Sequence, residues 1–333
     1  MLAHGVDHND FVRVTAGLSS WAGWLEAWVA AGDIHRELGD DAERNGRLRT
    51  AGESYVRAAV YYHFAKFLWL DDLTRYRKTV ALAVATLRHG MPMLDPTFER
   101  IEVPLPPARA VANLRRPAGG PSRAPFVVLV PGLDSTKEEF PAWEEWFLRR
   151  GLGTVSFDGP GQGEVGEALP MRPDYEVAVS ALLDALATRT DLDLARVGIS
   201  GVGLGNYYAA RAAAFEPRIK AVGVIGGPYT FKPGGERTLR KLMYSARIDD
   251  EAKAREYAST FTLAGVTSRI VQPYLVIHGK LDHSFPWQEA ERKAKEARRG
   301  ELVVFPDGGG VCYSVDYKAK PLLADWMKEK LES

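Results

Sequence analysis

The stretch Arg196-Val-Gly-Ile-Ser-Gly-Val-Gly-Leu-Gly-Asn-Tyr-Tyr-Ala-Ala-Arg211 decides the fold of this 333-residue chain. A short apolar run with β-branched residues passes through closely spaced glycines into two tyrosines and an alanine-rich segment. This order predicts a strand, a sharp turn and a helix. It has the form of a nucleophile elbow, in which the middle residue of Gly-x-nucleophile-x-Gly occupies a strained turn. The matching register, Gly201-Val-Gly-Leu-Gly205, places Gly203 at the nucleophile position, where it offers no side chain.

Ser200 offers a second register for the elbow. Gly198-Ile-Ser200 begins like a Gly-x-Ser-x-Gly motif, but Val202 stands at the closing position. A nucleophile at Ser200 would also place the turn three residues too early, within the strand. The remaining alternative is an ordinary strand-to-helix turn without a catalytic ancestry, and the loops elsewhere in the chain decide between them.

Composition indicates an ordinary globular protein with a large core, since 46% of the residues are hydrophobic and 26% are charged. The 43 basic residues balance the 43 acidic ones, so no net field favours nucleic acid or an anionic membrane. We therefore expect a small-molecule substrate, with no nucleic-acid or membrane partner. A homodimer through the apolar N-terminal helices is compatible with the sequence.

Cys312 is the single cysteine, which excludes an internal disulfide and a thiolate zinc cluster. The N-terminal residues lack a basic segment followed by an apolar one, and no run approaches the roughly 18 apolar residues of a membrane span. We expect a cytoplasmic protein that uses no metal and no cofactor.

Two domains are expected. Residues 1–97 carry helical periodicity and form a helical N-terminal cap domain, whose helix at 54–70 is apolar almost all round and should reach the site. Residues 98–333 form the core domain, with a helical insertion at about 228–270. Its expected strands are 101–105, 109–114, 126–130, 153–157, 196–202, 220–225, 274–278 and 302–305, and helices are expected at 137–150, 175–188 and 318–331. Strands that alternate with helices predict an α/β fold with a mostly parallel, doubly wound sheet.

Ligands of such sheets bind beyond the carboxyl ends of the strands, so the loops that follow the strands predict the site. These loops contain, in chain order, Leu133 with Asp134 and Ser135; Asp158 to Glu164; Gly203 with Leu204; Gly226 with Gly227; Lys280 to His283; and Gly308 to Cys312. We expect Asp158 and Gln162 to form a turn rather than take part in catalysis. Lys137 and Glu138 are expected to cap and solvate the helix that begins there.

The order of these loops resembles the oxyanion loop, nucleophile elbow, acid loop and histidine loop of the α/β-hydrolase fold. More narrowly, four segments resemble the FrsA-like, or dihydroxypseudooxynicotine-hydrolase-like, group of that superfamily. They are Ser-Tyr-Val-Arg-Ala-Ala-Val-Tyr-Tyr at 54–62, Pro-Gly-Leu-Asp-Ser-Thr-Lys-Glu-Glu at 131–139, Phe-Asp-Gly-Pro-Gly-Gln-Gly-Glu at 157–164 and Gly-Leu-Gly-Asn-Tyr-Tyr-Ala at 203–209. The resemblance implies hydrolysis of esters or of carbon–carbon bonds, including the shortening of polyketides.

Two departures from that group carry the functional information. Its elbow has serine where Gly203 stands, and its histidine falls on Gly310, two residues before Cys312. Only the acid remains, as Asp282. A Ser-His-Asp catalytic triad needs the hydroxyl to attack and the imidazole to move its proton. Covalent acyl-enzyme chemistry would therefore require Ser200 or Cys312 as a substitute nucleophile. The position of Cys312 favours a small buried residue instead.

The expected site keeps an oxyanion hole from the backbone N–H groups of Leu133 and Leu204. Proton transfer is assigned to Asp134, Asp282 and His283, with a structural turn as the alternative role of Asp282. Substrate contacts are expected from four further side chains: Tyr62, His63, Tyr207 and Tyr229. The alternative for His63 is a structural role as a hydrogen-bonded, partly buried histidine.

This combination favours a cofactor-independent lyase or cyclase acting on a polyketide-derived substrate. The lost triad is similar to that of enzymes that eliminate acetate from O-acetylated tetronates in antibiotic biosynthesis, and that resemblance implies the same reaction. The alternatives are an ester or carbon–carbon bond hydrolase with a relocated nucleophile, and a catalytically inactive binding protein.

Overall fold

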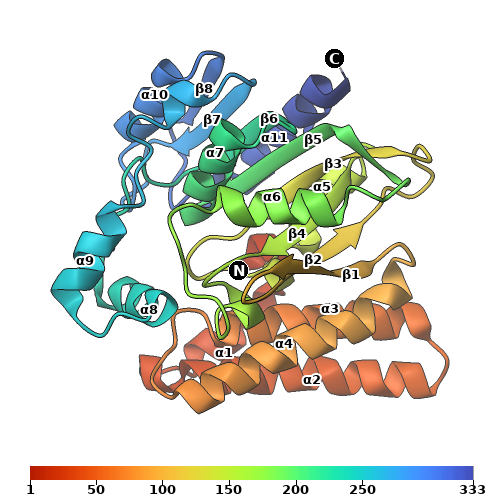
Figure 1. Ribbon diagram of the computed structural model, residues 1–333. Helices are drawn as coiled ribbons and strands as arrows, with labels where there is room; N and C mark the ends of the chain where they lie inside the picture. The colour runs from red at the N-terminus through yellow and green to blue at the C-terminus, as the bar shows by residue number, and fades with distance from the viewer. Residues whose placement is uncertain (333) are drawn as a thin grey trace. The chain divides into compact units, whose positions relative to one another are not determined.

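The computed structural model describes residues 1–332, in two compact units (Figure 1). The first comprises Met1–Arg100 together with Glu138–Trp143, and the second comprises Ile101–Lys137 and the chain from Glu144 onward. None of the described helices is both long enough and apolar enough to cross a membrane.

The first unit is helical. Its elements are η1 (Leu2–His4), α1 (His8–Ala16), η2 (Trp21–Gly23), α2 (Trp24–Arg44), α3 (Leu48–Ala65) and α4 (Leu73–Leu94). Glycines allow α3 to approach its two neighbours, because an added Cβ at Gly32 of α2 would lie 2.6 Å from the Tyr62 ring, and one at Gly52 of α3 would lie 2.9 Å from the Gly90 carbonyl of α4. The apolar helix predicted at 54–70 is therefore buried within its own bundle.

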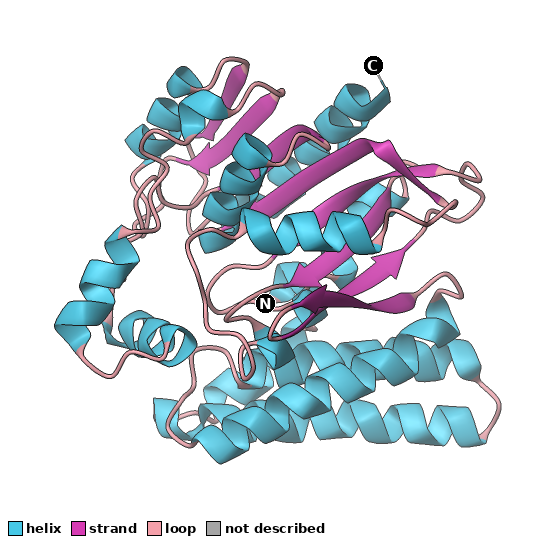
Figure 2. Cartoon of the chain, viewed as in Figure 1, coloured by secondary structure: helices cyan, strands magenta, loops and turns pink. Residues whose placement is uncertain are grey.

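The second unit is built on an eight-stranded sheet (Figure 2). Its strands are β1 (Glu99–Leu105), β2 (Ala108–Arg115), β3 (Ala124–Val130), β4 (Gly153–Asp158), β5 (Leu192–Val202), β6 (Ile219–Ile225), β7 (Tyr274–Gly279) and β8 (Gly300–Phe305). They lie in the order β1-β2-β4-β3-β5-β6-β7-β8. β2 pairs antiparallel with β4, and all pairs from β4 to β8 are parallel. The predicted α/β-hydrolase fold is confirmed.

Helices cover both faces of this sheet, with α6 and α7 in front of it and α11 behind it in Figure 1. The α-helices of this part of the chain are α5 (Pro141–Leu148), α6 (Glu176–Ala185), α7 (Leu204–Phe215), α8 (Glu236–Ala246), α9 (Glu251–Ser259), α10 (Trp287–Glu296) and α11 (Asp316–Glu332). Short 3₁₀ turns are η3 (Lys137–Glu139), η4 (Gly163–Val165), η5 (Thr267–Arg269) and η6 (Tyr313–Val315). The strands β3, β4 and β7 are buried along their whole length, as expected of strands covered on both faces.

Three predicted elements differ from the structure. The apolar helix expected at 54–70 belongs to α3, which begins earlier, at Leu48, and ends earlier, at Ala65. The single helix expected at 137–150 is a 3₁₀ turn followed by α5, which begins at Pro141 because proline lacks an N–H group and is best placed in the first turn of a helix. The strand expected from Arg196 begins at Leu192, which pairs with Ala124 before a register shift.

Candidate active site

The predicted elbow after β5 has a strained backbone conformation and a glycine at its centre. Gly203 stands between β5 and α7 with φ 60° and ψ −125°, a combination that strains any residue other than glycine. Its N–H donates to the Ile225 carbonyl at 3.4 Å, and its carbonyl accepts from the Asn206 N–H at 3.1 Å. The turn is therefore the strained strand-to-helix turn on which α/β hydrolases present a nucleophile.

The three glycines of the elbow meet different surroundings. An added Cβ at Gly201 would collide with the Gly205 carbonyl, and one at Gly205 would collide with the Val130 carbonyl. These two glycines are required by close backbone approach. A Cβ at Gly203 would have nothing within 4 Å. Packing therefore does not require glycine at this position, and the space beside it is open.

The loop after β8 shows the same feature at the expected histidine position. Gly310 has φ 47°, and an added Cβ there would also have nothing within 4 Å. The next residues, Val311 and Cys312, adopt left-handed backbone conformations with φ 50° and 64°, which few non-glycine residues do. This loop keeps a strained shape around a position from which a side chain is missing.

Asp282 ties the acid loop to this histidine loop. One carboxylate oxygen accepts from the N–H groups of Ser284 at 2.8 Å and Phe285 at 3.0 Å, and the other accepts from the Val311 N–H at 2.7 Å. The Asp282 side chain is buried, whereas the neighbouring His283 is exposed. The carboxylate is thus held by backbone donors, in the manner of the structural role weighed for it above.

The loops that carry these residues converge at the carboxyl edge of the sheet. An added Cβ at Gly226 would lie 2.6 Å from Val311, and one at Gly227 would collide with the Gly203 carbonyl. On the other side, a Cβ at Gly132 of the oxyanion loop would lie 3.4 Å from the Leu204 nitrogen. The oxyanion loop, the elbow, the turn after β6 and the histidine loop therefore form one site, as their chain order predicted.

Lys241 of α8 is a candidate that the sequence reasoning missed. Its side chain is only 4% exposed, and burial lowers its pKa to about 8. Of the carboxylates that oppose this shift, Asp134 acts most strongly, followed by Glu167 and Asp158. The carboxylate of the oxyanion loop thus interacts with an ammonium group that can lose its proton near neutral pH. The sequence signal was weak, since a lysine between the buried Leu239 and Leu242 resembles the edge of an amphipathic helix.

Lys137 does not have the position that the sequence predicts for it. It was predicted to solvate a helix, but its ammonium is buried and contacts Asp158 at 3.0 Å and Glu164 at 2.6 Å. Its N–H also donates to Asp158 at 2.8 Å. A buried ammonium is stable only beside opposite charge, so Lys137 stays paired with these two carboxylates. The pairing joins the oxyanion loop to the loop after β4.

The two substitute nucleophiles lie in unsuitable places. Ser200 is fully buried inside β5, between Leu129 and Gly223 of the adjacent strands. Cys312 is 1% exposed, and burial raises the pKa of its thiol to about 12, so the thiol stays protonated near neutral pH. Neither side chain is poised for attack.

The expected substrate-binding side chains are buried and engaged elsewhere in their own units. Tyr62 donates to Asp33 at 2.6 Å, and His63 lies 3.1 Å from Glu139 with its pKa lowered by burial. Tyr207 donates to the Pro173 carbonyl at 2.9 Å. Tyr229 donates to Glu296 at 2.7 Å, and Arg292 lies over its ring at 3.9 Å. Tyr62 and His63 belong to the first unit, and the hydroxyls of Tyr207 and Tyr229 are each occupied by a contact within the second unit.

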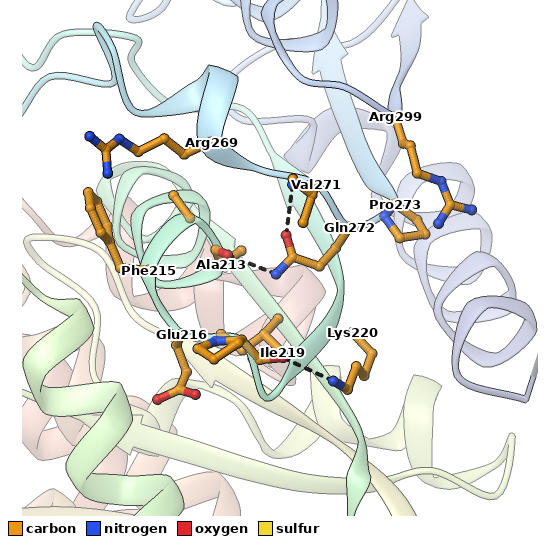
Figure 3. Close-up of a pocket in the computed structure, with 12 residues that line it drawn as sticks. Ala213, Phe215, Glu216, Ile219, Lys220, Arg269, Val271, Gln272, Pro273 and Arg299 are labelled. Carbon is orange, nitrogen blue, oxygen red and sulfur yellow. Dashed lines mark hydrogen bonds between the residues drawn. The ribbon is translucent and has the colours of Figure 1, made fainter.

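A separate groove of about 390 Å³ lies at the opposite edge of the sheet (Figure 3). Ile219, Pro273 and Arg299, which line it, stand at or just before the amino ends of β6, β7 and β8. It is therefore distinct from the site at the elbow.

Comparison with known proteins places this geometry in a family. Residues 2–232 match the FrsA-like family, described as esterase FrsA-like. The chain is 31% identical to the 2,6-dihydropseudooxynicotine hydrolase of Paenarthrobacter nicotinovorans, over 99% of this chain and 90% of that protein. The crystal structure of the 2,6-dihydroxy-pseudo-oxynicotine hydrolase is similar with a TM-score of 0.90 and 29% identity, covering 99% of this chain and 94% of the other.

The structure of AbyA5 shares the fold, with a TM-score of 0.76 and 19% identity over 98% of this chain and 94% of that one. The family match covers more than half of the chain, and the hydrolase of P. nicotinovorans matches it over nearly its whole length. This chain belongs to the FrsA-like esterase family of the α/β-hydrolase superfamily.

Proposed function

We propose that this chain is a cofactor-independent lyase of polyketide or other secondary metabolism that eliminates acetate from a small O-acetylated substrate, with an O-acetylated tetronate as the leading candidate. The observation that carries the proposal is the open elbow. Gly203 keeps the strained turn of a nucleophile and Gly310 keeps the strained loop of a histidine, yet open space surrounds both positions. A site that stabilises charge but has no hydroxyl to attack suits elimination better than acyl transfer.

The elimination needs one proton transfer and no covalent intermediate. A base removes the acidic C–H proton, the electrons of that bond form a carbon–carbon double bond, and the bond between the neighbouring substrate carbon and the acetoxy oxygen breaks. Acetate leaves with that electron pair. The N–H groups of Leu133 and Leu204 would stabilise the developing carboxylate, each by about 3–4 kcal/mol on the precedent of other oxyanion sites.

Lys241 and Asp134 are the groups we propose for the proton transfer. A buried lysine whose pKa is lowered to about 8 is neutral in a useful fraction of molecules near neutral pH, and its amine can then act as the base. Asp134 would hold the resulting ammonium. His283 remains the alternative base, since it is an exposed residue of the acid loop itself. A cyclase would use the same base and the same oxyanion donors.

A hydrolase is the second candidate, because the 31% identical relative is named a hydrolase. Here water, rather than a side chain, would occupy the space beside Gly203 and attack the substrate, since Ser200 and Cys312 are unsuitable nucleophiles. The same base would then activate that water.

Labelled water separates the two reactions. The protein is incubated with an O-acetylated tetronate in H₂¹⁸O, and acetate and the organic product are measured by mass spectrometry. Elimination releases acetate without ¹⁸O and leaves an alkene. Attack of water on the acetyl group places ¹⁸O in the acetate and leaves an alcohol, which would replace the lyase by the hydrolase. Release of neither product from acetylated or simple ester substrates would favour a binding protein.

A further inference from the structure

Gln162, in the loop between β4 and η4, makes four hydrogen bonds although its side chain is only 3% exposed. Its oxygen accepts from the Gly159 N–H at 2.8 Å and from the Tyr175 hydroxyl at 2.7 Å. Its nitrogen donates to the carbonyls of Pro131 at 2.6 Å and Gly132 at 3.2 Å. All four partners lie in the second unit.

The orientation of this amide is determined by its partners. A backbone N–H can only donate, so the end of the Gln162 amide that faces Gly159 must be the oxygen. The NH₂ group then necessarily faces the two carbonyls of the oxyanion loop. Tyr175 can reach the amide only because residue 159 is glycine, since an added Cβ there would lie 2.5 Å from the tyrosine hydroxyl.

The two carbonyls held by Gln162 belong to the peptide bonds that precede Gly132 and Leu133. In a trans peptide the C=O and N–H groups point in opposite directions. A Gly132 carbonyl held against Gln162 therefore directs the Leu133 N–H away from Gln162. Glycine at 132 would otherwise leave this peptide plane free to rotate, because glycine has the widest backbone freedom.

We propose that Gln162 is a positioning residue that orients the Leu133 N–H as an oxyanion donor. This inference rests on the proposed function, in which that N–H receives the departing carboxylate. Gln162 acts through the backbone of Pro131 and Gly132 and does not itself touch the substrate. The turn-forming role expected from the sequence remains, and the contacts with the oxyanion loop add to it.

The test uses Gln162→Glu, which keeps the shape and removes the NH₂ donor, in the full chain. Sodium acetate is titrated while the amide signals of Leu133 and Leu204 are followed by ¹⁵N NMR, and turnover of the acetylated tetronate is measured in parallel. We expect the Leu133 response to acetate to disappear and the Leu204 response to persist. Loss of one oxyanion donor should reduce kcat by about 10²–10³-fold with little change in KM.

Gln272→Glu is the matched control. The Gln272 amide donates to the Ala213 carbonyl at 2.9 Å beside the groove of Figure 3. It therefore makes the same side-chain-to-backbone hydrogen bond as Gln162, but to a segment other than the oxyanion loop. This variant should leave both amide responses and kcat unchanged. If Gln162→Glu does not fold, Tyr175→Phe removes the hydroxyl donor from the same amide, and should weaken the Leu133 response in the same direction.

An unchanged Leu133 response and unchanged amide exchange at Leu133 in a folded Gln162→Glu variant would overturn the inference. The outcome remains separable from the proposed function. If acetate shifts neither amide in the wild type and no substrate is turned over, the proposed function fails. Faster exchange of the Leu133 amide in Gln162→Glu, but not in Gln272→Glu, would then still support the positioning of this N–H.

Discussion

The two sides of the candidate active site differ in how their loops are held. On the oxyanion side, the loop from Pro131 to Lys137 is held by Gln162 and by the buried contacts of Lys137 with Asp158 and Glu164. On the nucleophile side, the elbow and the histidine loop keep their strained backbones while Gly203 and Gly310 leave open space.

This difference separates charge stabilisation from covalent attack. An oxyanion hole is made of backbone N–H groups, so it survives any substitution that preserves the loop. Nucleophile and general base are side chains and disappear with single substitutions. The site can therefore lose one half of hydrolase chemistry and keep the other. The predictions below test this separation, beginning with the largest expected effect.

The double variant Gly203→Ser/Gly310→His should recover covalent chemistry. The space at both positions accepts a side chain, Asp282 is in place at the loop that would carry the histidine, and the oxyanion hole is retained. We expect ester hydrolysis to rise by about 10⁴-fold over the wild type, because the members of a triad act as a unit. Stopped-flow hydrolysis of p-nitrophenyl acetate and labelling of residue 203 by a fluorophosphonate would measure it.

The single variants Gly203→Ser and Gly310→His are the controls for this gain. Each should remain close to wild type, since a serine without a base and a histidine without a nucleophile are both inert. A folded double variant that neither reacts with the fluorophosphonate nor hydrolyses the ester would show that the two loops no longer form a triad geometry.

Lys241→Met should reduce turnover of the acetylated substrate by about 10²–10⁴-fold, the range for loss of a general base. In the wild type, turnover should rise with pH through about 8, because the amine of Lys241 acts only when it is neutral. The pH profile of kcat/KM checks this. Loss of turnover in His283→Ala, with turnover retained in Lys241→Met, would move the base to His283.

The same lysine makes stability depend on pH. Its pKa is about 8 in the folded chain, below the ordinary lysine value of 10.5, so the unfolded state binds more protons between these two values. The free energy of unfolding should therefore rise with pH across this window by up to about 3 kcal/mol, and this contribution should be absent in Lys241→Met. Urea titrations at pH 8 and pH 10 measure the free energy of unfolding of the wild type and of Lys241→Met. An equal change between the two pH values in both proteins would contradict the burial of the Lys241 charge.

Gly205→Ala should destabilise the chain far more than Gly203→Ala. The first places a Cβ against the Val130 carbonyl, which belongs to the backbone of a central strand and cannot move aside. We expect a loss of about 3 kcal/mol or more for Gly205→Ala, and about 1–2 kcal/mol for Gly203→Ala, where only the strained φ opposes the change. Chemical denaturation measures both, and equal losses would mean that Gly203 is also required by packing.

Asp282→Asn should have the smallest effect. The oxygen of the amide can keep the N–H groups of Ser284 and Phe285, but the NH₂ group would face the N–H of the half-buried Val311, which would lose its acceptor. A loss of about 1 kcal/mol in the free energy of unfolding is expected, because only one half-buried hydrogen bond is lost, with faster proteolysis of the loop after β8. A large loss of turnover at unchanged stability would instead give Asp282 a chemical role.

Patterns that are local in the chain were readable from the sequence. β3 is a short run of apolar residues, and the glycines at 201, 203 and 205 mark the elbow, because strand and turn preferences act over a few neighbouring residues. The start of β5 at Leu192 was missed, since its first residues include charged side chains and Leu192 pairs with Ala124, a residue remote in the sequence.

The sequence by itself determined the α/β-hydrolase fold and the order of the loops, and it predicted that Gly203 and Gly310 stand at the positions of the nucleophile and the histidine, because each follows from residue identity along the chain. Only the tertiary structure decided which glycines are required by packing, that Lys241 is buried and interacts electrostatically with Asp134, and that Gln162 holds the oxyanion loop. These properties depend on distances between segments remote in sequence and on the exclusion of water, neither of which a local pattern encodes.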